Sequence, residues 1–279
     1  MFEDINISFI GSGTMAEAII RGLVSLAIIA PEQIIAAGPR AERGQELAAR
    51  YGVRVTEDNR QAAEEGQIVV LSIKPQMLPR VIPEIRGHLR RRDLVLSILA
   101  GTPIRRLADG LAHAAVVRAM PNTPAQIGQG ITVWTVTREV SEIQKEQARA
   151  ILASLGQEVF VEEEDYLDMA TALSGTGPAY VFMVMEAMID AGVHMGFSRR
   201  VARQLVFQTL RGSVEYADRS GRHVAELRNQ VTSPGGTTAE ALYHMEKGGL
   251  RTVISRGIFA AYQRSIALGK GKKASDIDV

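Results

Sequence analysis

The chain has 279 residues, 46% of them hydrophobic and 23% charged, an ordinary composition for one or two globular domains with a sizeable core. The 32 basic and 31 acidic residues nearly cancel, so no basic field indicates nucleic acid or an anionic membrane as a partner. The absence of cysteine excludes disulfides, thiolate catalysis and cysteine-ligated metals, and the five scattered histidines lack metal-site spacing, so no metal is expected.

The first half of the chain alternates short β-branched runs with helical patterns. The first predicted strand covers residues 5–10 and is followed by a predicted helix over 15–26. Further strands are predicted at 33–37, 53–56, 68–73, 94–99 and 115–120, with helices at 42–51 and 77–89 and edge strands at 131–136 and 158–162. Strands interleaved with helices form right-handed crossovers, so the pattern predicts an α/β fold with a mainly parallel, doubly wound Rossmann-type sheet.

A glycine-rich turn joins the first strand to the first helix. Its sequence is Gly11-Ser12-Gly13-Thr14-Met15-Ala16. Gly11 permits a tight turn, Gly13 lets the backbone approach a pyrophosphate, and Ala16 allows close helix–strand packing. The helix N-terminus offers free N–H groups and a positive dipole end. The strand–turn–helix context favours dinucleotide binding over a purely structural turn.

The end of the second predicted strand bears on the choice of cofactor. An NAD site usually has an acidic residue there, whereas an NADP site has a cation for the additional phosphate. This strand ends in Ala37-Gly38-Pro39-Arg40, with Arg40 and no carboxylate at the tip. NADP(H) is therefore the preferred cofactor, and NAD(H) stays possible because Glu42 lies close by.

Two later strand ends carry further candidates for cofactor contacts. Ser72, Lys74 and Pro75 follow the fourth strand, and Ala100 and Gly101 follow the fifth. Both groups fall at carboxyl ends of parallel strands, where doubly wound sheets bind ligands. Lys74 is either a nicotinamide-side contact or an ordinary surface charge.

The short third strand is followed by Asn59. This residue is either a helix cap or a contact to the adenosine ribose, and the sequence favours neither.

From residue 164 the strand pattern stops. Helices are predicted at 179–192, 199–216, 224–230, 238–247 and 249–268. The run 180–185 is apolar all round, so it must be buried in a core or against a second subunit, and the small size of the helical half favours the subunit interface. We expect a dinucleotide-binding domain at 1–163, a helical dimerisation and substrate domain at 164–270, and a flexible tail at 271–279.

A hydroxyl-rich loop at 230–238 precedes one of these helices. It places Ser233, Thr237 and Thr238 around Pro-Gly-Gly. The loop is either a simple helix N-cap or, since a cap needs only one hydroxyl, a site for a small carboxylate at a helix start.

The start of the chain lacks the basic segment and long apolar stretch of a signal peptide. No stretch reaches the ~18 uncharged apolar residues of a membrane span. We therefore expect a soluble, cytoplasmic protein.

Several of these motifs, in this order, resemble the pyrroline-5-carboxylate reductase family over about residues 5–269. The Val-Thr-Ser-Pro-Gly-Gly-Thr-Thr run is highly specific to that family. The matching stretches are 9–16, 74–76, 120–124, 173–180 and 231–238. One departure is the strand end at residues 37–40, which is commonly polar in the family, and this weakens the inference about cofactor preference.

The resemblance implies reduction of L-1-pyrroline-5-carboxylate to L-proline by NAD(P)H, in homodimers with intertwined helical domains that often assemble into decamers of five dimers. It implies cofactor contacts from Gly11 and Gly13 of the turn and from Asn59, Ser72, Lys74, Pro75, Ala100 and Gly101. The turn itself and the second strand end add Ser12, Thr14, Met15 and Arg40 as candidate cofactor contacts. The resemblance also implies substrate contacts from Ser233, Gly236, Thr237 and Thr238, with Glu164 near the site. The acidic run at 162–165 is either a solvated face or part of the substrate site, where an unpaired carboxylate would attract a cationic imine.

Thr238 is the expected catalytic residue, hydrogen-bonded to the ring nitrogen of the imine. Because a Thr hydroxyl is a poor acid, the proton could equally come from water or arrive on the substrate as an iminium. The alternatives are another imine or β-hydroxyacid reductase on the same scaffold, and a non-catalytic NADP-sensing binding protein.

Overall fold

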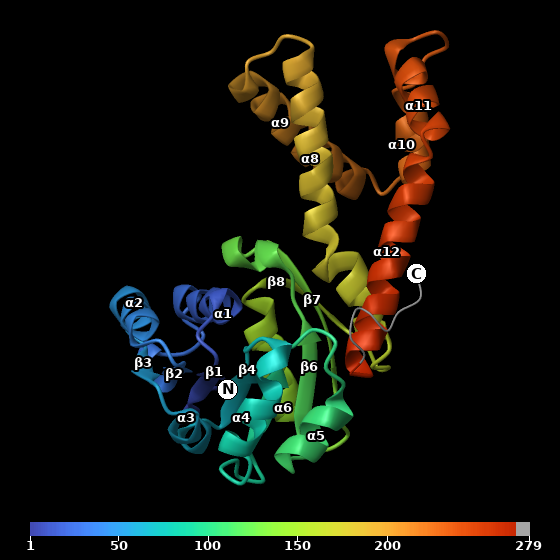
Figure 1. Cartoon of the computed structure of the whole chain (residues 1–279). Helices are drawn as coiled ribbons and strands as arrows, with labels where there is room; N and C mark the ends of the chain where they lie inside the picture. Colours follow the sequence, from blue (N-terminus) through green and yellow to red (C-terminus); the bar gives the residue numbers. More distant parts are fainter. Residues whose placement is uncertain (272–279) are drawn as a thin grey trace. The chain divides into compact units, whose positions relative to one another are not determined.

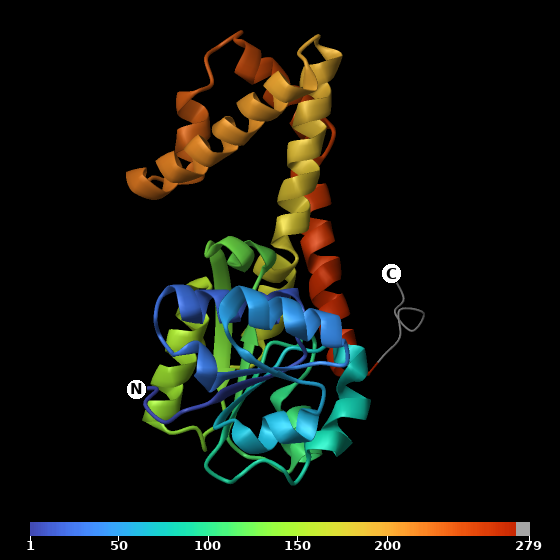
Figure 2. The ribbon, with the colours of Figure 1, turned by 90° about the vertical axis from the view of Figure 1, so that its left-hand side faces the viewer.

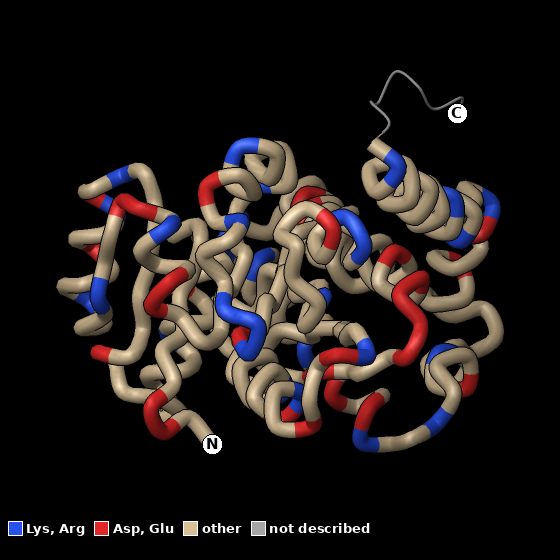
Figure 3. Tube along the Cα trace, turned by 90° about the horizontal axis from the view of Figure 1, so that it is seen from below, with Lys and Arg blue, Asp and Glu red and all other residues tan. Residues whose placement is uncertain are grey.

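The computed structural model describes residues 1–271, which divide into two compact units. Unit 1 comprises Met1–Thr176 together with the C-terminal residues from Ala261, and unit 2 comprises Gly177–Ala260. Lys, Arg, Asp and Glu are interspersed along the trace of the described chain (Figure 3), as expected from the nearly balanced charges.

Unit 1 is built on one eight-stranded sheet with the order β3-β2-β1-β4-β5-β6-β7-β8 (Figure 1). Neighbouring strands are parallel except for the antiparallel pair β6–β7. The strands are β1 (Ile7–Ile10), β2 (Ile34–Ala37), β3 (Arg54–Thr56), β4 (Ile68–Leu71), β5 (Leu94–Ser97), β6 (Val116–Met120), β7 (Gly130–Val136) and β8 (Gly156–Phe160). The prediction of a mainly parallel, doubly wound sheet is confirmed. Only β8 of the two predicted edge strands lies at an edge, since β7 is inserted between β6 and β8.

Helices cover both faces of this sheet, as Figures 1 and 2 show. Successive strand residues point to opposite faces: Phe9 packs in the cluster that holds Ile19 and Ile151, whereas Ile10 packs in the cluster that holds Leu78 and Leu107. The first face is covered by α1 (Thr14–Ser25), α2 (Ala41–Tyr51) and α6 (Glu142–Ala153), and the second by α3 (Asn59–Glu65), α4 (Leu78–Ile85) and α5 (Ile104–Leu111). The sheet is therefore buried between two helical layers, which is why its strands read as continuous apolar runs.

All regular secondary structure in unit 2 is helical, as predicted. It contains α8 (Gly177–His194), α9 (Arg199–Ser220), α10 (Val224–Gln230), α11 (Thr237–Lys247) and the first part of α12 (Leu250–Gly269). Helices α8 and α9 approach closely where Gly192 faces Ala202. The apolar run of α8 is not buried within the chain, because Val181, Phe182 and Met183 are 48%, 59% and 61% exposed. Unit 2 on its own thus leaves a large apolar surface uncovered.

The continuous helical stretch Tyr166–His194 is long and apolar enough to cross a membrane by length and composition alone. The same apolar exposure is expected of a helix that packs against a second copy of the chain.

The two compact units divide between Thr176 and Gly177, whereas the sequence predicts the change to the helical domain at residue 164. The short helix α7 (Tyr166–Ala170), the π-helical turn Thr171–Gly175 and the last turns of α12 all group with unit 1. Of the predicted tail at 271–279, residues 272–279 lie outside the described part of the chain.

Candidate functional site

The glycine-rich turn lies at the carboxyl end of β1, next to the point where the strand order reverses between β1 and β4. Doubly wound sheets bind dinucleotides at this switch point. Gly11 has φ +105°, a conformation that side chains rarely adopt, and a Cβ there would lie 2.9 Å from the Ile73 backbone nitrogen. A Cβ on Gly13 would meet nothing within 4 Å. The first glycine is thus required by the chain itself, whereas the second leaves open space in front of the helix N-terminus.

Three hydrogen bonds from different elements hold this turn in place. Gly11 donates its N–H to the Ala37 carbonyl at 2.9 Å, and the Ser72 hydroxyl donates to the Gly11 carbonyl at 2.7 Å. The Arg43 Nε–H donates to the Ser12 carbonyl at 3.1 Å. These bonds within the chain preorganise the turn, which lowers the entropy that cofactor binding must overcome.

The turn opens onto a cavity of about 670 Å³, within the range of ligand-binding pockets. It is bordered by the carboxyl ends of β1, β2, β4 and β5. The predicted cofactor residues that line it are Gly13, Thr14, Met15, Arg40, Ser72, Lys74, Pro75 and Ala100, and the other lining residues are Glu17, Arg43, Ile73, Ile98 and Leu99. Arg40, Arg43 and Lys74 bring positive charge to the wall of this cavity, which suits an anionic phosphate-containing cofactor.

Arg43 is a site residue that the sequence analysis missed. It lies one helical turn after Arg40 on α2, so the i, i+3 spacing of two arginines at a helix start was the available signal. Its guanidinium pairs with Glu17 and, at 2.9 Å, with Glu46. Glu42, the acidic residue on which the possibility of NAD(H) as cofactor rests, is exposed and does not line the cavity.

Glu17 carries a carboxylate that lines the cavity and pairs with Arg43. Burial alone would raise the pKa of Glu17, but hydrogen bonds from Arg43 and Tyr51 and the charges of Arg43 and Arg50 outweigh it and hold the pKa below its ordinary value of 4.5. The hydrogen bond to Glu17 raises the pKa of Arg43 in turn. Both groups are therefore charged at neutral pH, and the pair fixes the orientation of the guanidinium at the rim of the cavity.

Four predicted cofactor residues do not line this cavity: Gly11, Ser12, Asn59 and Gly101. Ser12 is buried, and its hydroxyl occupies the space that a side chain at Gly38 would need, with a built Cβ only 2.4 Å away. Asn59 is not a helix cap, because Asp58 caps α3 by accepting from the Arg60 N–H. The Asn59 side chain instead donates to Glu84 at 2.7 Å.

In unit 2, the hydroxyl-rich loop leads directly into α11. The helix begins at Thr237 with Gly236 as its N-cap and has no side-chain cap, so the simple N-cap interpretation is wrong. Gly236 donates its N–H to the Ser233 carbonyl at 3.1 Å, and a Cβ on Gly236 would lie 2.4 Å from the Ser233 hydroxyl oxygen. A helix start without a capping side chain leaves backbone N–H groups available to an anion.

The expectation of an unpaired carboxylate at Glu164 is wrong. Its Oε1 accepts from the Arg118 guanidinium at 2.7 Å and from the Ile104 N–H at 2.7 Å. The Glu164 carboxylate is thus paired inside unit 1 with a buried cation, which it shares with Asp168.

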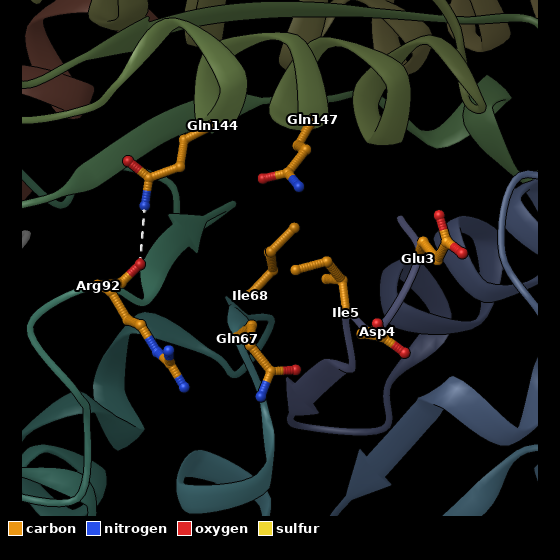
Figure 4. A pocket seen from close by; sticks show the side chains of 8 residues that line it. All are labelled: Glu3, Asp4, Ile5, Gln67, Ile68, Arg92, Gln144 and Gln147. Atoms are coloured by element: carbon orange, nitrogen blue, oxygen red, sulfur yellow. Dashed lines mark hydrogen bonds between the residues drawn. The ribbon is translucent and has the colours of Figure 1, made fainter. Parts of the chain in front are cut away.

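A second cavity, of about 350 Å³, lies at the opposite, amino ends of β1, β4 and β5 (Figure 4). Its amide side chains serve the fold: Gln67 accepts from the Asn6 N–H at 2.6 Å, and Gln144 donates to the Arg92 carbonyl at 3.1 Å. Ligands of doubly wound sheets bind at the carboxyl ends, so the cavity beside the glycine-rich turn is the candidate cofactor site.

Two family models match the chain. Residues 6–101 match "NADP oxidoreductase coenzyme F420-dependent", the part that holds every lining residue of the cofactor cavity. Residues 164–268 match "Pyrroline-5-carboxylate reductase dimerisation", which includes the hydroxyl-rich loop and the exposed apolar helix.

Full-length relatives and solved structures agree with these matches. Pyrroline-5-carboxylate reductase of a Synechocystis species is 41% identical over 95% of this chain and 99% of its own length, and that of Pseudomonas aeruginosa is 39% identical over 95% and 97%. The structure of Plasmodium falciparum pyrroline carboxylate reductase with NADP bound superposes with a TM-score of 0.88 at 33% identity, covering 96% of this chain and 99% of that one. The chain belongs to the pyrroline-5-carboxylate reductase family.

Proposed function

We propose that this chain reduces L-1-pyrroline-5-carboxylate to L-proline, with NADPH as hydride donor, in the final step of proline synthesis. The observation that carries the proposal is the cation-lined cavity at the switch point of the sheet, in a chain that matches the family's reductases over nearly its whole length. The hydride adds to the imine carbon and a proton adds to the nitrogen, so the C=N bond becomes a C–N single bond and NADP⁺ is released.

The cofactor-binding residues would act as follows. The backbone of the turn from Gly11 to Met15 and the α1 N-terminus hold the pyrophosphate, while Arg40 and Arg43 attract the 2′-phosphate. Ser72, Lys74, Pro75, Ala100 and Gly101 contact the nicotinamide half. Bound NADPH supplies the hydride. We keep Asn59 as a ribose-side contact, which requires its side chain to leave Glu84 when the cofactor binds.

The substrate would be held by the hydroxyl-rich loop of unit 2. The N–H groups of Gly236 and Thr237 and the Ser233 hydroxyl bind the carboxylate, and the Thr238 hydroxyl bonds the ring nitrogen. Holding the imine in one orientation favours hydride transfer by proximity, an effect worth up to about 7–11 kcal/mol in well-held pairs. Glu164 would reach a substrate only through its second carboxylate oxygen, because the hydrogen bonds from Ile104 and Arg118 both fall on Oε1.

We also propose that the chain acts in the cytoplasm as a homodimer, with five dimers forming a decamer. The match of unit 2 to a dimerisation family and the exposed apolar face of α8 support the dimer. The decamer rests on the family resemblance alone.

The test of the proposed reaction is the loss of NADPH absorbance with L-1-pyrroline-5-carboxylate, with NADH in a parallel reaction. Rapid turnover with a higher kcat/KM for NADPH is expected. Arg40→Ala is expected to reduce that preference, because it removes a cation from the cavity wall. Tight NADPH binding without turnover would leave the cofactor site intact and overturn the substrate assignment.

Replacing Thr238 by alanine is expected to lower kcat about tenfold, the effect of one lost hydrogen bond to the reacting group, and to change the KM for NADPH less than twofold. The matched control is Thr232→Ala in the same loop, whose hydroxyl is directed to the Arg228 carbonyl at 2.7 Å and which is expected to keep full turnover. An unchanged kcat in Thr238→Ala would remove Thr238 from the reaction.

A further inference from the structure

The proposed chemistry makes no use of a buried arginine in unit 1, Arg118. Arg118 on β6 is 3% exposed. It donates from one terminal nitrogen to Glu164 at 2.7 Å and from the other to Asp168 of α7 at 3.1 Å. The fork of the guanidinium thus bridges two carboxylates, which a lysine, with one compact ammonium group, is poorly suited to do.

The two carboxylates also accept hydrogen bonds from two other segments, the start of α5 and the last turns of α12. Glu164 accepts from the N–H of Ile104, the first residue of α5, at 2.7 Å. Asp168 accepts from the hydroxyl of Ser265, in the last turns of α12, at 2.7 Å. Ser265 is 2% exposed, so its hydrogen bond is shielded from water. We refer to Arg118, Glu164, Asp168 and Ser265 as the Arg118 cluster.

Both of these segments adjoin the Ala100–Gly101 turn. The start of α5 follows Gly101 after only two residues. On the other side, Gly101 faces the end of α12: its φ is +60°, and a Cβ there would lie 2.9 Å from Leu268 Cβ and 3.4 Å from the Ser265 carbonyl oxygen. The turn is therefore held between the α5 N-terminus and the α12 C-terminus, and the Arg118 cluster joins both.

Ala100 lines the cofactor cavity, and its position at the end of β5 places it on the side of the switch point opposite to β2 and Arg40. A dinucleotide at such a site spans the switch point, with its adenosine towards β2. The Ala100–Gly101 turn is thus placed to contact the nicotinamide half only.

We propose that the Arg118 cluster is a positioning device that sets the Ala100–Gly101 turn, and through it the nicotinamide ring, without touching cofactor or substrate. This inference rests on the proposed function for the identity of the cofactor. A purely structural ion pair would affect the stability of the fold. Its loss would not weaken binding of the nicotinamide half while leaving binding of the adenosine half unchanged.

The decisive variant is Ser265→Ala, which removes one hydroxyl and leaves the Arg118–carboxylate pairs in place. Two ligands are compared by calorimetry: NADPH, and 2′-phospho-ADP-ribose, which lacks the nicotinamide. We expect the Kd for NADPH to rise about five- to tenfold, as for loss of one ordinary hydrogen bond, and the Kd for 2′-phospho-ADP-ribose to change less than twofold. In turnover, kcat is expected to fall while the KM for the imine stays nearly constant.

The matched control is Ser154→Ala at the end of α6. Ser154 is also buried, and its hydroxyl donates to the Ile151 carbonyl at 2.6 Å, so this variant loses a comparable buried hydrogen bond away from the turn. It is expected to leave both Kd values unchanged. Equal weakening of both ligands in Ser265→Ala, or no weakening of either, would overturn the proposal.

A second variant, Arg118→Lys, keeps the buried charge and removes the fork. As in Ser265→Ala, the binding of NADPH is expected to weaken and that of 2′-phospho-ADP-ribose is not. The Kd for NADPH is expected to rise at least tenfold. If this variant does not fold, the binding measurements on Ser265→Ala decide whether the proposal holds. Because binding is measured without turnover, a wild-type chain that binds NADPH and fails to reduce the imine would refute the proposed reaction and leave this test intact.

Discussion

Replacing Gly11 by alanine is expected to destabilise unit 1 by on the order of 3 kcal/mol, from backbone strain and overpacking together, and to reduce NADPH affinity at least a hundredfold. The reason lies within the chain itself. The added Cβ would sit at φ +105°, 2.8 Å from Ile73 Cγ2 and 2.9 Å from the Ile73 nitrogen. The turn would have to move away from β4, and its hydrogen bonds with Ala37 and Ser72 would be distorted.

The matched variant is Gly13→Ala, two residues further along. Gly13 has φ −78°, and its Cβ would meet nothing within 4 Å. Gly13→Ala is therefore expected to melt at the temperature of the wild type and still to lose NADPH affinity, because the methyl group would occupy the space reserved for a phosphate. Thermal unfolding and calorimetry on the two variants separate the two roles. Wild-type stability in Gly11→Ala, or wild-type affinity in Gly13→Ala, would contradict the assignment of the corresponding glycine.

Replacing Phe182 by glutamate is expected to convert the proposed dimer into a monomer and to remove most of the turnover. Phe182 is 59% exposed in the single chain, between Val181 and Met183, which are 48% and 61% exposed. A phenylalanine that becomes buried in an interface contributes about 4 kcal/mol, equivalent to a roughly thousandfold change in the dimer dissociation constant. A buried, unpaired carboxylate would add a desolvation cost.

The measurement is sedimentation equilibrium over a range of protein concentrations, with turnover assayed on the same samples. Ile143→Glu is the matched control, because Ile143 is 69% exposed but belongs to α6 in unit 1. It is expected to preserve both the dimer and the activity. A Phe182→Glu protein that sediments as the wild type does would place the dimer contact elsewhere on the chain.

The sequence pattern was sufficient for the fold class because the relevant signals are local. A strand buried on both faces must be apolar at every position, as 68–71 is, and a glycine-rich turn between a strand and a helix has few structural interpretations. The helical elements of unit 2 were predicted within a few residues for the same reason. Helix α3 was not singled out, because it has only seven residues and buries only Ala62 and Ala63, too few for a periodic signal.

The sequence by itself determined the parallel sheet, the helical second half and the glycine-rich turn, since each depends on spacing between neighbouring residues. Only the tertiary structure decided what the isolated polar residues do. Glu164 was expected to be unpaired and is paired with Arg118, which is 46 residues away in the chain; Arg43 lines the cofactor cavity; and Ser265 reaches Asp168 across 97 residues. The partner of a buried charge is set by which strands and helices become neighbours, and a linear pattern carries no record of that pairing.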